Sequence, residues 1–401
     1  MTTNARPAID QLDTTHAAVV ARAKALAPIL AEHAAESEAQ RFVHPASITA
    51  MKDAGLFRIL LPQLVGGYEL RLRTMSECVT AVSQACTASG WALLVVTAHD
   101  WILGMFPEAG QREVYADSPD ALVAGGLATQ GRAVRADGGW TVSGRWQFAS
   151  AVDHSQWLIM GSTIETSQPD DPKHVHVVVP TSDATIDDTW FTLGLRGTGS
   201  KDIVVDNVFV PDHRAAFTGT LFGGRGDGVD LHPTNLYRTP VLSGLALHLA
   251  SATVGIALTA QQRFIDQTTG RAHAYTGKAI RESVGLQMRL AESDAEIRAA
   301  QLLTFDLCDQ LSDAADSGEP ADNMLRARTK WQAAYITQLC RRAIDRIFQA
   351  SGARGVHDSS ALQQLFRDLN TATHHATADP DAAAESYGRM LLGLSPGTYL
   401  L

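Results

Sequence analysis

The sequence predicts an α+β protein that is mainly helical, with one β-rich region between two helical regions. Apolar residues recur at three- and four-residue steps near both ends of the chain, which is the spacing of amphipathic helices. The middle instead holds short β-prone runs separated by Pro, Gly and Asp. Hydrophobic residues make up 45% of the 401 residues, so a large core is expected. We therefore expect a helical domain over 1–122, a β domain over 123–235 and a helical bundle over 236–401.

The N-terminal region is expected to contain helices interrupted by a loop. In the stretch HPASITAMKDAG, Pro45 suits a first helical position and Gly55 suits the residue just past a helix end. Pro62 and the Gly-Gly pair that follows it interrupt the periodicity in LFRILLPQLVGGYEL, which indicates a loop. A further helical span is expected over about 74–99.

The middle region is expected to form a small sheet or barrel. Asp137, Gly138 and Gly139 lie between β-prone flanks, which is a hairpin signal. The runs WLIMGSTI, HVHVVVP and DIVVDNVFVP are further strand candidates. The segment 216–235 is rich in glycine and is expected to be a loop.

The C-terminal region shows two long apolar stripes. The first consists of Val284, Met288, Ala291, Ala295, Ala299 and Leu302. The second consists of Ala333, Ile336, Cys340, Ala343, Ile347 and Ala350, and Gly352 ends it. Stripes with many small residues indicate helices that pack closely, as in a helical bundle.

Composition excludes several classes of function. The formal net charge is -10 and no dense block of Lys and Arg occurs, so neither nucleic acid nor an anionic membrane is expected as a partner. No apolar run approaches the about 20 residues of a membrane helix, and the first residues lack the apolar middle of a signal peptide. A cytoplasmic protein is expected, with Cys78, Cys86, Cys308 and Cys340 as buried free thiols.

Metal and nucleotide sites are not expected either. His174 and His176 lie on one side of a β run but lack a third ligand at suitable spacing, so a solvent-facing pair is expected. The glycine-rich GLRGTGS has no Walker lysine and is followed by a strand pattern instead of a helix. We interpret it as a turn that enters a strand.

The stretch WQFASAVDHSQW contains a serine, an aspartate and a histidine, as a hydrolase triad does. Ser150, Asp153 and His154 lie within five residues of a strand-like segment, where neighbouring side chains alternate faces. A triad needs the serine and the carboxylate on opposite nitrogens of one imidazole, and no Gly-x-Ser-x-Gly elbow is present. A hydrolase is therefore disfavoured.

Five stretches in order resemble the acyl-CoA dehydrogenase superfamily. They are LLPQLVGGYEL, SGRWQFASA, LGLRGTGSKDIVVDNVFVP, RAHAYTGKAIRES and SGARG followed by FRDL. Together they cover nearly the whole chain. The resemblance implies an N-terminal helical domain, a central β-barrel and a C-terminal four-helix bundle, which agrees with the three regions described above.

Acyl-CoA dehydrogenase chemistry itself is disfavoured because the expected base is absent. Residues 231–260 contain no Asp or Glu, and the sequence after Arg367-Asp368 holds His375, Ala376 and Thr377 where a glutamate would be expected. A general base must lie within hydrogen-bond reach of the proton that it removes. A dehydrogenase-like enzyme with a displaced base stays an alternative, as does a scaffold protein that binds no flavin.

The chain more closely resembles the two-component, or group D, flavin-dependent monooxygenases. The shared features are Trp-x-Phe-x-Ser followed by Asp-His and Trp, the stretch GLRGTGS, and a histidine after RDL. The resemblance implies that a separate NAD(P)H-dependent reductase supplies reduced FMN or FAD, which reacts with O2 to a C4a-hydroperoxide. The expected substrate is an apolar or aromatic small molecule, such as a phenol, steroid catabolite or polyketide, with an amino sugar as the alternative. A homotetramer is also implied.

The resemblance assigns catalytic residues. Ser150 matches the residue whose hydroxyl faces flavin N5, and hydroxyl groups both donate and accept hydrogen bonds. His375 matches a late histidine near the flavin or substrate, with its neighbour His374 as the rival. His99, in VVTAHDW, is a weaker candidate for the pocket wall, with helix packing as the alternative.

The same resemblance assigns binding residues. Arg271 matches an arginine that reaches a flavin phosphate from a neighbouring subunit, and Arg263 is the second choice. Further flavin contacts are expected from Trp146, Phe148, Gly352 and Gly355. Substrate contacts are expected from Tyr237, Leu242 and Trp101. One departure is that Thr129, Gln130 and Gly131 replace the Pro-x-Gly pattern of many group members, so the loop beside the flavin is expected to differ.

Overall fold

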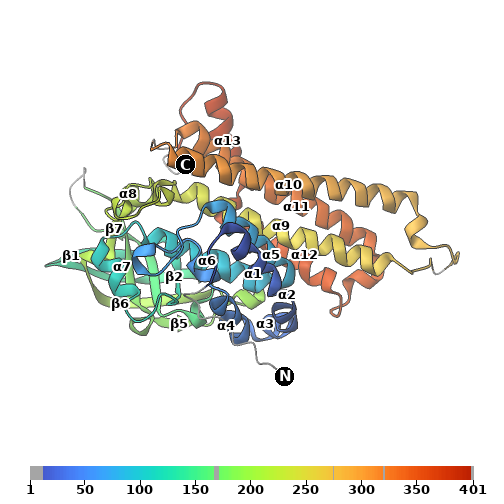
Figure 1. Cartoon of the computed structure of the whole chain (residues 1–401), viewed down its shortest axis with the longest axis horizontal. Helices are drawn as coiled ribbons and strands as arrows, with labels where there is room; N and C mark the ends of the chain where they lie inside the picture. Colours follow the sequence, from blue (N-terminus) through green and yellow to red (C-terminus); the bar gives the residue numbers. More distant parts are fainter. Residues whose placement is uncertain (1–11, 167–170, 274, 319–320, 399–401) are drawn as a thin grey trace.

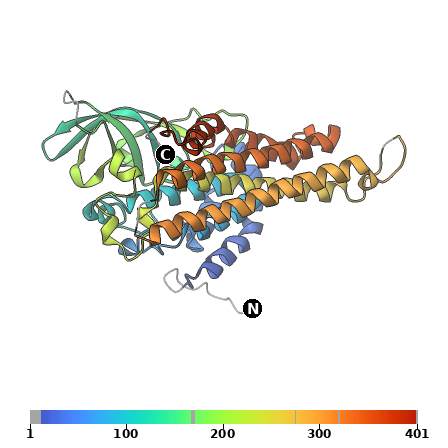
Figure 2. The ribbon, with the colours of Figure 1, turned by 90° about the horizontal axis from the view of Figure 1, so that it is seen from above.

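The computed structural model describes residues 12–166, 171–273, 275–318 and 321–398. Figure 1 shows the sheet at one end of the molecule and the long C-terminal helices extending to the other end. The shorter N-terminal helices lie between them. Seen from above, the long helices run side by side and reach well beyond the rest of the molecule (Figure 2).

The order of elements is helices, strands, then helices again. The helices are α1 (His16–Ala25), α2 (Ala27–Glu32), α3 (Ala34–Gln40), α4 (Pro45–Asp53), α5 (Leu72–Ala85), α6 (Thr87–Leu103), α7 (Glu108–Val114), α8 (Thr218–Phe222), α9 (Val241–Thr268), α10 (Val284–Asp316), α11 (Asn323–Ser351), α12 (Ala361–Ala372) and α13 (Pro380–Leu391). The strands are β1 (Val123–Ala136), β2 (Gly139–Ala149), β3 (Trp157–Ile164), β4 (His174–Pro180), β5 (Thr185–Asp187), β6 (Lys201–Pro211) and β7 (Ala215–Phe217).

The N-terminal signals lie where the sequence predicted them. Pro45 is the first residue of α4, and Gly55 follows the helix with a φ of 70°, which favours glycine. The span predicted over 74–99 is two helices, because Cys86 is extended and separates α5 from α6. Nearly every residue of α6 is buried, so this helix forms the centre of the N-terminal region.

The β region is a seven-stranded sheet in the order β5-β6-β2-β1-β3-β4-β7. β1 and β2 form the expected hairpin, while β1 and β3 pair in parallel. Among the described strands, β5 and β7 lie at opposite edges, so hydrogen bonds do not close the expected barrel. One face of the sheet buries its own apolar cluster, which includes Trp140, Trp146 and Met160.

The C-terminal helices form a bundle around α9, which contacts α5, α11 and α12. α9 is long and apolar enough to cross a membrane by length and composition, contrary to our expectation that no such run exists. However, 83% of its most apolar window is buried inside the protein. That burial is the property of a central bundle helix, since its neighbours cover the apolar surface.

The two predicted stripes differ in outcome. The α11 stripe is confirmed, since Ala333, Ile336, Cys340 and Ile347 are buried and the helix ends at Gly352. The α10 stripe was assigned to the wrong face. Its residues Val284, Met288, Ala291, Ala295, Ala299 and Leu302 are all exposed, whereas Ser293, Ile297, Ala300, Thr304 and Leu307 are buried. α10 therefore has an outward face that is apolar and an inward face that mixes apolar residues with the hydroxyl residues Ser293 and Thr304.

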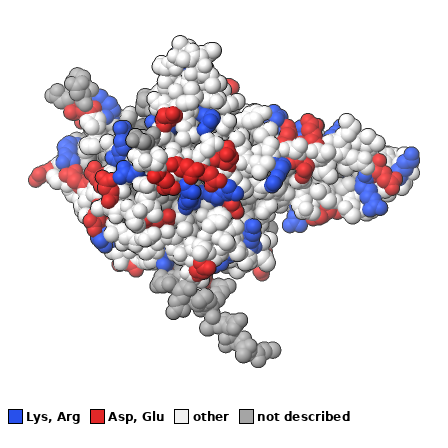
Figure 3. All heavy atoms as spheres, turned by 45° about the horizontal axis from the view of Figure 1, so that its top comes forward, with Lys and Arg blue, Asp and Glu red and all other residues white. Residues whose placement is uncertain are grey.

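Charged side chains of both signs are mixed on the face drawn in Figure 3. Arg71 pairs with Asp313 and Asp316, and Arg73 pairs with Asp309, so α5 and α10 are joined by ion pairs. No continuous basic patch lies on the described part of this face. All four cysteines are buried and free, as predicted.

Candidate active site

The stretch that contains Ser150 turns sharply at the end of β2. Phe148 and Ala151 both have positive φ values, 67° and 60°, which are uncommon for residues with a side chain. Ser150 lies between them, one residue beyond the strand end and 5% exposed. The turn therefore directs Ser150 inward while Phe148, 62% exposed, points outward.

The Ser150 hydroxyl belongs to a line of hydrogen bonds. Trp91 of α6 donates its indole N–H to Ser150 Oγ at 3.1 Å. Ser150 Oγ lies 2.6 Å from Ser200 Oγ, which lies 2.7 Å from Thr198 Oγ1. Thr198 donates to the carbonyl of Leu195 at 2.8 Å. All four side chains are buried.

His375 lies beside the same tryptophan. Its ring centroid is 6.0 Å from that of Trp91, in an edge-to-face arrangement, so one indole contacts both predicted catalytic residues. His374 and His375 lie in the turn after α12. Desolvation by the surrounding protein lowers the pKa of the His375 imidazole to about 4. The residue as a whole is nevertheless exposed, so its neutral ring is open to a ligand.

Hydrogen bonding also selects the tautomer of His375. Its Nδ1 accepts the backbone N–H of Thr377 at 3.2 Å and lies 2.9 Å from the Thr377 hydroxyl. In the neutral ring the proton is therefore on Nε2. At neutral pH, His375 is a hydrogen-bond donor through Nε2. The exposed His374 makes no such pair among the described residues.

An exposed aromatic wall borders Ser150. The rings of Phe148 and Trp190 lie 6.2 Å apart and edge to face. Trp190 donates its N–H to the carbonyl of Leu195, the same carbonyl that ends the hydroxyl line. Because the two rings are nearly perpendicular, one of them can lie parallel to a flavin plane while the other meets that plane with its edge.

Asp368 ties this wall to α12. Its carboxylate accepts the backbone N–H of Leu195 at 2.7 Å, and burial raises its pKa to about 7. Leu195 itself has a positive φ of 53°. The aspartate of the Arg-Asp pair thus stabilises a strained turn, and it is not an accessible base of the kind that a dehydrogenase needs.

Several predicted contact residues belong to the core instead. Trp146 is fully buried in the sheet, and its N–H donates to Gly161, so it does not wall the flavin. Trp101 and Tyr237 are also fully buried, and they donate to the carbonyls of Leu236 and Leu60. Aromatic side chains of this size are core residues unless an open cavity adjoins them.

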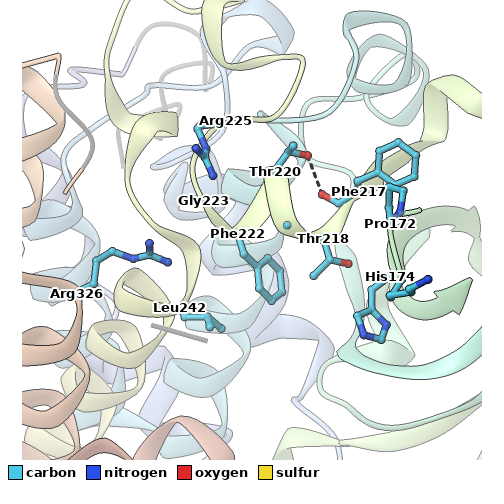
Figure 4. A pocket seen from close by; sticks show the side chains of 12 residues that line it. Pro172, His174, Phe217, Thr218, Thr220, Phe222, Gly223, Arg225, Leu242 and Arg326 are labelled. Carbon is cyan, nitrogen blue, oxygen red and sulfur yellow. Dashed lines mark hydrogen bonds between the residues drawn. The ribbon is translucent and has the colours of Figure 1, made fainter. Parts of the chain in front are cut away.

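Leu242 is the predicted substrate residue that does border an open space. It lines a cavity of about 490 Å³ between β4, α8 and the first turns of α9 and α11. Figure 4 shows Phe222 and Leu242 in the middle of this cavity, with Arg225 and Arg326 on one side and His174 on the other.

His99 also serves packing. It is 4% exposed, its Nδ1 lies 2.9 Å from the carbonyl of Val123, and burial lowers its pKa to about 4. His176 was expected to face solvent but is fully buried, bonded to the carbonyl of Leu127 and to Thr218. Both rings bridge the sheet to neighbouring helices because buried polar groups need partners.

The residues suspected of a triad have other partners. Lys201 forms an ion pair with Asp153 at 2.5 Å. His154 lies 2.7 Å from the carbonyl of Val43. Neither contacts Ser150 among the described interactions, so the hydrolase interpretation has no geometric support.

The two arginines predicted to bind the flavin phosphate lie far from Ser150 of the same chain. Arg263 and Arg271 belong to the end of α9 and the turn that leads into α10, at the tip of the bundle opposite the sheet (Figure 1). Gly352 has a φ of 66° after α11, and Gly355 packs so closely on Ser351 that a side chain would clash.

One cluster in the described part of the chain has metal-binding residue types. Ligand atoms of His33, Glu36 and His44 lie within 4.8 Å of one another. The two rings stack at 4.0 Å with planes only 7° apart, and His44 Nδ1 caps α4. Parallel rings cannot aim their lone pairs at one ion, so we interpret the cluster as a stacked pair beside a carboxylate.

Sequence patterns missed four residues of the site: Trp91, Thr198, Ser200 and Asp368. Three have no motif of their own, because a tryptophan in an apolar helix and hydroxyl groups in a turn are common. Thr198 and Ser200 do lie in GLRGTGS, which the sequence identified as a turn. The Arg-Asp pair was noted, but its partner Leu195 was not predictable from spacing.

Comparison with known proteins agrees with this geometry. Residues 247–380 match a family model described as acyl-CoA dehydrogenase, C-terminal domain. A pigment production hydroxylase of Rhodococcus sp. (strain ATCC 21145) is 32% identical over 97% of this chain and 100% of that protein. The oxygenase component of an FADH(2)-dependent resorcinol hydroxylase of Rhizobium sp. (strain MTP-10005) is 32% identical over 95% of each.

Solved structures give the same result. The 3-HSA hydroxylase from Rhodococcus sp. RHA1 has a TM-score of 0.91 and 29% identity, covering 96% of this chain and 100% of that one. XiaF from Streptomyces sp., in complex with FADH2 and glycerol, has a TM-score of 0.90 and 28% identity, covering 96% of this chain and 98% of that one. This chain therefore belongs to the oxygenase components of two-component flavin-dependent monooxygenases, within the acyl-CoA dehydrogenase superfamily.

Proposed function

We propose that this monooxygenase hydroxylates a phenolic aromatic small molecule, using reduced FAD delivered by a separate NAD(P)H-dependent reductase. The observation that carries the proposal is the meeting of Ser150, Trp91 and His375 next to an exposed aromatic wall. When bound, reduced flavin reacts with dioxygen and supplies the oxygen atom that enters the substrate. Relatives named for resorcinol and hydroxyphenylacetate support an aromatic substrate.

The residues of the chain have distinct roles in this proposal. Phe148 or Trp190 would offer an apolar face for a bound flavin ring, and Ser150 would hydrogen-bond to the N5 edge of that ring. His375 is neutral at pH 7 and donates through Nε2, so it can hydrogen-bond to the oxygen that leaves the cofactor or to the phenol oxygen.

We further propose that the enzyme works as a cytoplasmic homotetramer. The exposed apolar face of α10 supports association, since apolar stripes of this kind are usually covered. The position of Arg271 at the far tip of the bundle supports a phosphate contact made to a neighbouring subunit. Four free buried thiols support a reducing compartment.

The test is a single-turnover hydroxylation assay. Photoreduced FAD, or photoreduced FMN in a parallel reaction, is bound without oxygen and then mixed with labelled dioxygen and a panel of phenols. We expect one labelled oxygen atom in the product with FAD. The Ser150→Ala variant should form less product and release more hydrogen peroxide. Failure of both reduced flavins to bind or to oxygenate any phenol would refute the proposal.

A further inference from the structure

The hydroxyl line beneath Ser150 has a direction, and we propose that this direction makes the site select reduced over oxidised flavin. The inference rests on the proposed function, because it takes Ser150 to face flavin N5. The line runs from Trp91 through Ser150, Ser200 and Thr198 to the carbonyl of Leu195. Its two ends decide which way every proton points.

The far end of the line can only accept. Thr198 Oγ1 lies 2.8 Å from the carbonyl oxygen of Leu195. Two oxygens repel at this distance unless a proton lies between them, and a carbonyl oxygen carries none. Thr198 therefore donates its single hydroxyl proton to the carbonyl oxygen of Leu195.

The donor in each of the next two hydrogen bonds follows from this. Thr198 and Ser200 are 2.7 Å apart, so a proton lies between them, and Ser200 must supply it. Ser200 and Ser150 are 2.6 Å apart, and by the same reasoning Ser150 supplies that proton. The near end agrees, because the indole N–H of Trp91 can only donate, and it points to Ser150.

Ser150 is consequently left with one lone pair that can still accept a hydrogen bond. Its proton goes to Ser200 and one lone pair receives the Trp91 N–H, so the second lone pair is available to a ligand. Toward a cofactor, Ser150 is a hydrogen-bond acceptor. Reduced flavin carries a hydrogen on N5 and can donate to it. Oxidised flavin has only a lone pair on N5, so it would meet the Ser150 lone pair without a proton between them.

Thr198 and Ser200 act through Ser150 and are therefore positioning residues. Thr198 is fully buried and Ser200 is 3% exposed. The Asp368 carboxylate holds the N–H of Leu195 at 2.7 Å, so α12 keeps the accepting carbonyl in place. Buried lines of hydrogen bonds with fixed ends polarise one another and resist reversal.

The experiment compares Thr198→Val with Thr198→Ser. Valine keeps the shape and removes the hydroxyl, which releases the Ser200 proton toward Ser150 and the Ser150 proton toward the ligand. Serine keeps the hydroxyl. Dissociation constants for oxidised and photoreduced FAD are measured without oxygen, by ultrafiltration. We expect valine to lower the ratio of oxidised to reduced dissociation constants by about tenfold, the worth of one hydrogen bond. Serine should keep the ratio of the wild type.

Two further variants guard against a folding defect in the first. Ser200→Ala removes the acceptor of the Ser150 proton and should lower the ratio as Thr198→Val does. Trp91→Phe removes the donor at the near end but leaves the Ser150 proton on Ser200, so the ratio should be retained. Circular dichroism melting checks that each variant is folded.

The outcomes separate this inference from the proposed function. If the wild type oxygenates phenols but folded Thr198→Val and Ser200→Ala variants keep its ratio, the direction of the line is refuted and the function stands. A loss of selectivity in Trp91→Phe equal to that in Ser200→Ala would also refute it. If the wild type binds neither form of FAD or FMN, both proposals fail.

Discussion

The two ends of the proposed flavin site differ in how completely one chain builds them. At the ring end, Ser150, Trp91 and His375 come from three elements that are distant in sequence, and they meet through short contacts. At the phosphate end, Arg271 lies at the base of the turn between α9 and α10, where its carbonyl accepts the N–H of Ile280 at 2.9 Å. Figure 1 shows this turn at the end of the bundle away from the sheet. At the ring end Ser150 and Trp91 are buried and His375 is exposed, whereas Arg271 is half-buried in a turn whose other described residues are mostly exposed.

This difference indicates that the two ends follow different physical rules. A buried hydrogen-bond line is fixed by the folding of one chain, because every donor must find its acceptor. The side chain of Arg271 is half-buried and has no ion-pair partner among the described residues, so its guanidinium is available to a second molecule. In our proposal a complete site therefore needs two copies of the chain, one for each end.

The largest expected effect is complementation between two variants that each form less product than the wild type. Ser150→Ala damages the ring end and Arg271→Ala damages the phosphate end. If the ends of one site belong to different subunits, coexpressed variants should regain about a quarter of the wild-type product yield, because random pairing restores that share of sites. The measurement is hydroxylation by purified mixed oligomers.

The control for complementation pairs Ser150→Ala with His375→Ala. Both changes lie at the ring end of the same chain, so mixing should restore nothing. Absence of recovery in the Ser150 and Arg271 mixture, with both variants folded and associated, would contradict the division of the site between subunits.

The next effect concerns the outward face of α10. Ala295 lies in the middle of that face and is exposed. We expect Ala295→Glu to give a smaller oligomer by light scattering, because a charge would be desolvated at the contact. Reduced flavin should then bind more weakly while the ring end keeps its structure. Ala17→Glu places the same change on exposed α1 and should leave the oligomer intact. An unchanged oligomer in Ala295→Glu would exclude this face as the contact.

The same face shows where sequence analysis reaches its limit. The periodicity of α10 identified a helix and an apolar stripe, but Ala295 and Met288 point outward and Ile297 and Thr304 point inward. Periodicity reports that a face is apolar, and it does not report which molecule covers that face. The α11 stripe was assigned correctly because only one of its faces is apolar.

The sequence could predict those residues of the candidate site that lie within a recognisable motif. Ser150 and His375 were predicted as catalytic because each lies in a recognisable segment, and their catalytic roles stay predictions. The structure brings both residues to Trp91. Trp91 and Ser200 were missed because their roles arise from contacts between separate elements. Trp146 was wrongly assigned to the flavin wall, since an aromatic in a strand has two faces to choose from and it fills the sheet core.

The third prediction uses the buried interior that supports the ring end. Burial lowers the pKa of His99, His176 and His248 to about 4, against about 6.5 for an unfolded histidine. Between these values the unfolded chain binds more protons than the folded one. Stability should therefore fall as the pH drops from about 6.5 to about 4, by up to roughly 3 kcal/mol for each ring.

Urea unfolding across that pH range measures the effect. His248→Phe keeps a ring of similar size and removes one titrating group, so its stability should fall less steeply with acid. His374→Phe makes the same change at an exposed site and should follow the wild type. Identical acid slopes in all three proteins would show that His248 is not held neutral by burial.

A last expected effect has the opposite sign and concerns one carboxyl group at the ring end. Burial raises the pKa of Asp368 to about 7, whereas an unfolded aspartate titrates near 3.8. Between these values the folded chain keeps a proton that the unfolded chain has lost, so Asp368 lowers the free energy of unfolding as the pH rises through that window.

Asp368→Asn keeps an oxygen to accept the Leu195 N–H and cannot ionise. Its unfolding free energy should lose up to about 1.4 kcal/mol less per pH unit than that of the wild type. Parallel curves for the two proteins would mean that Asp368 is already ionised in the fold, and that the ring end tolerates a buried charge.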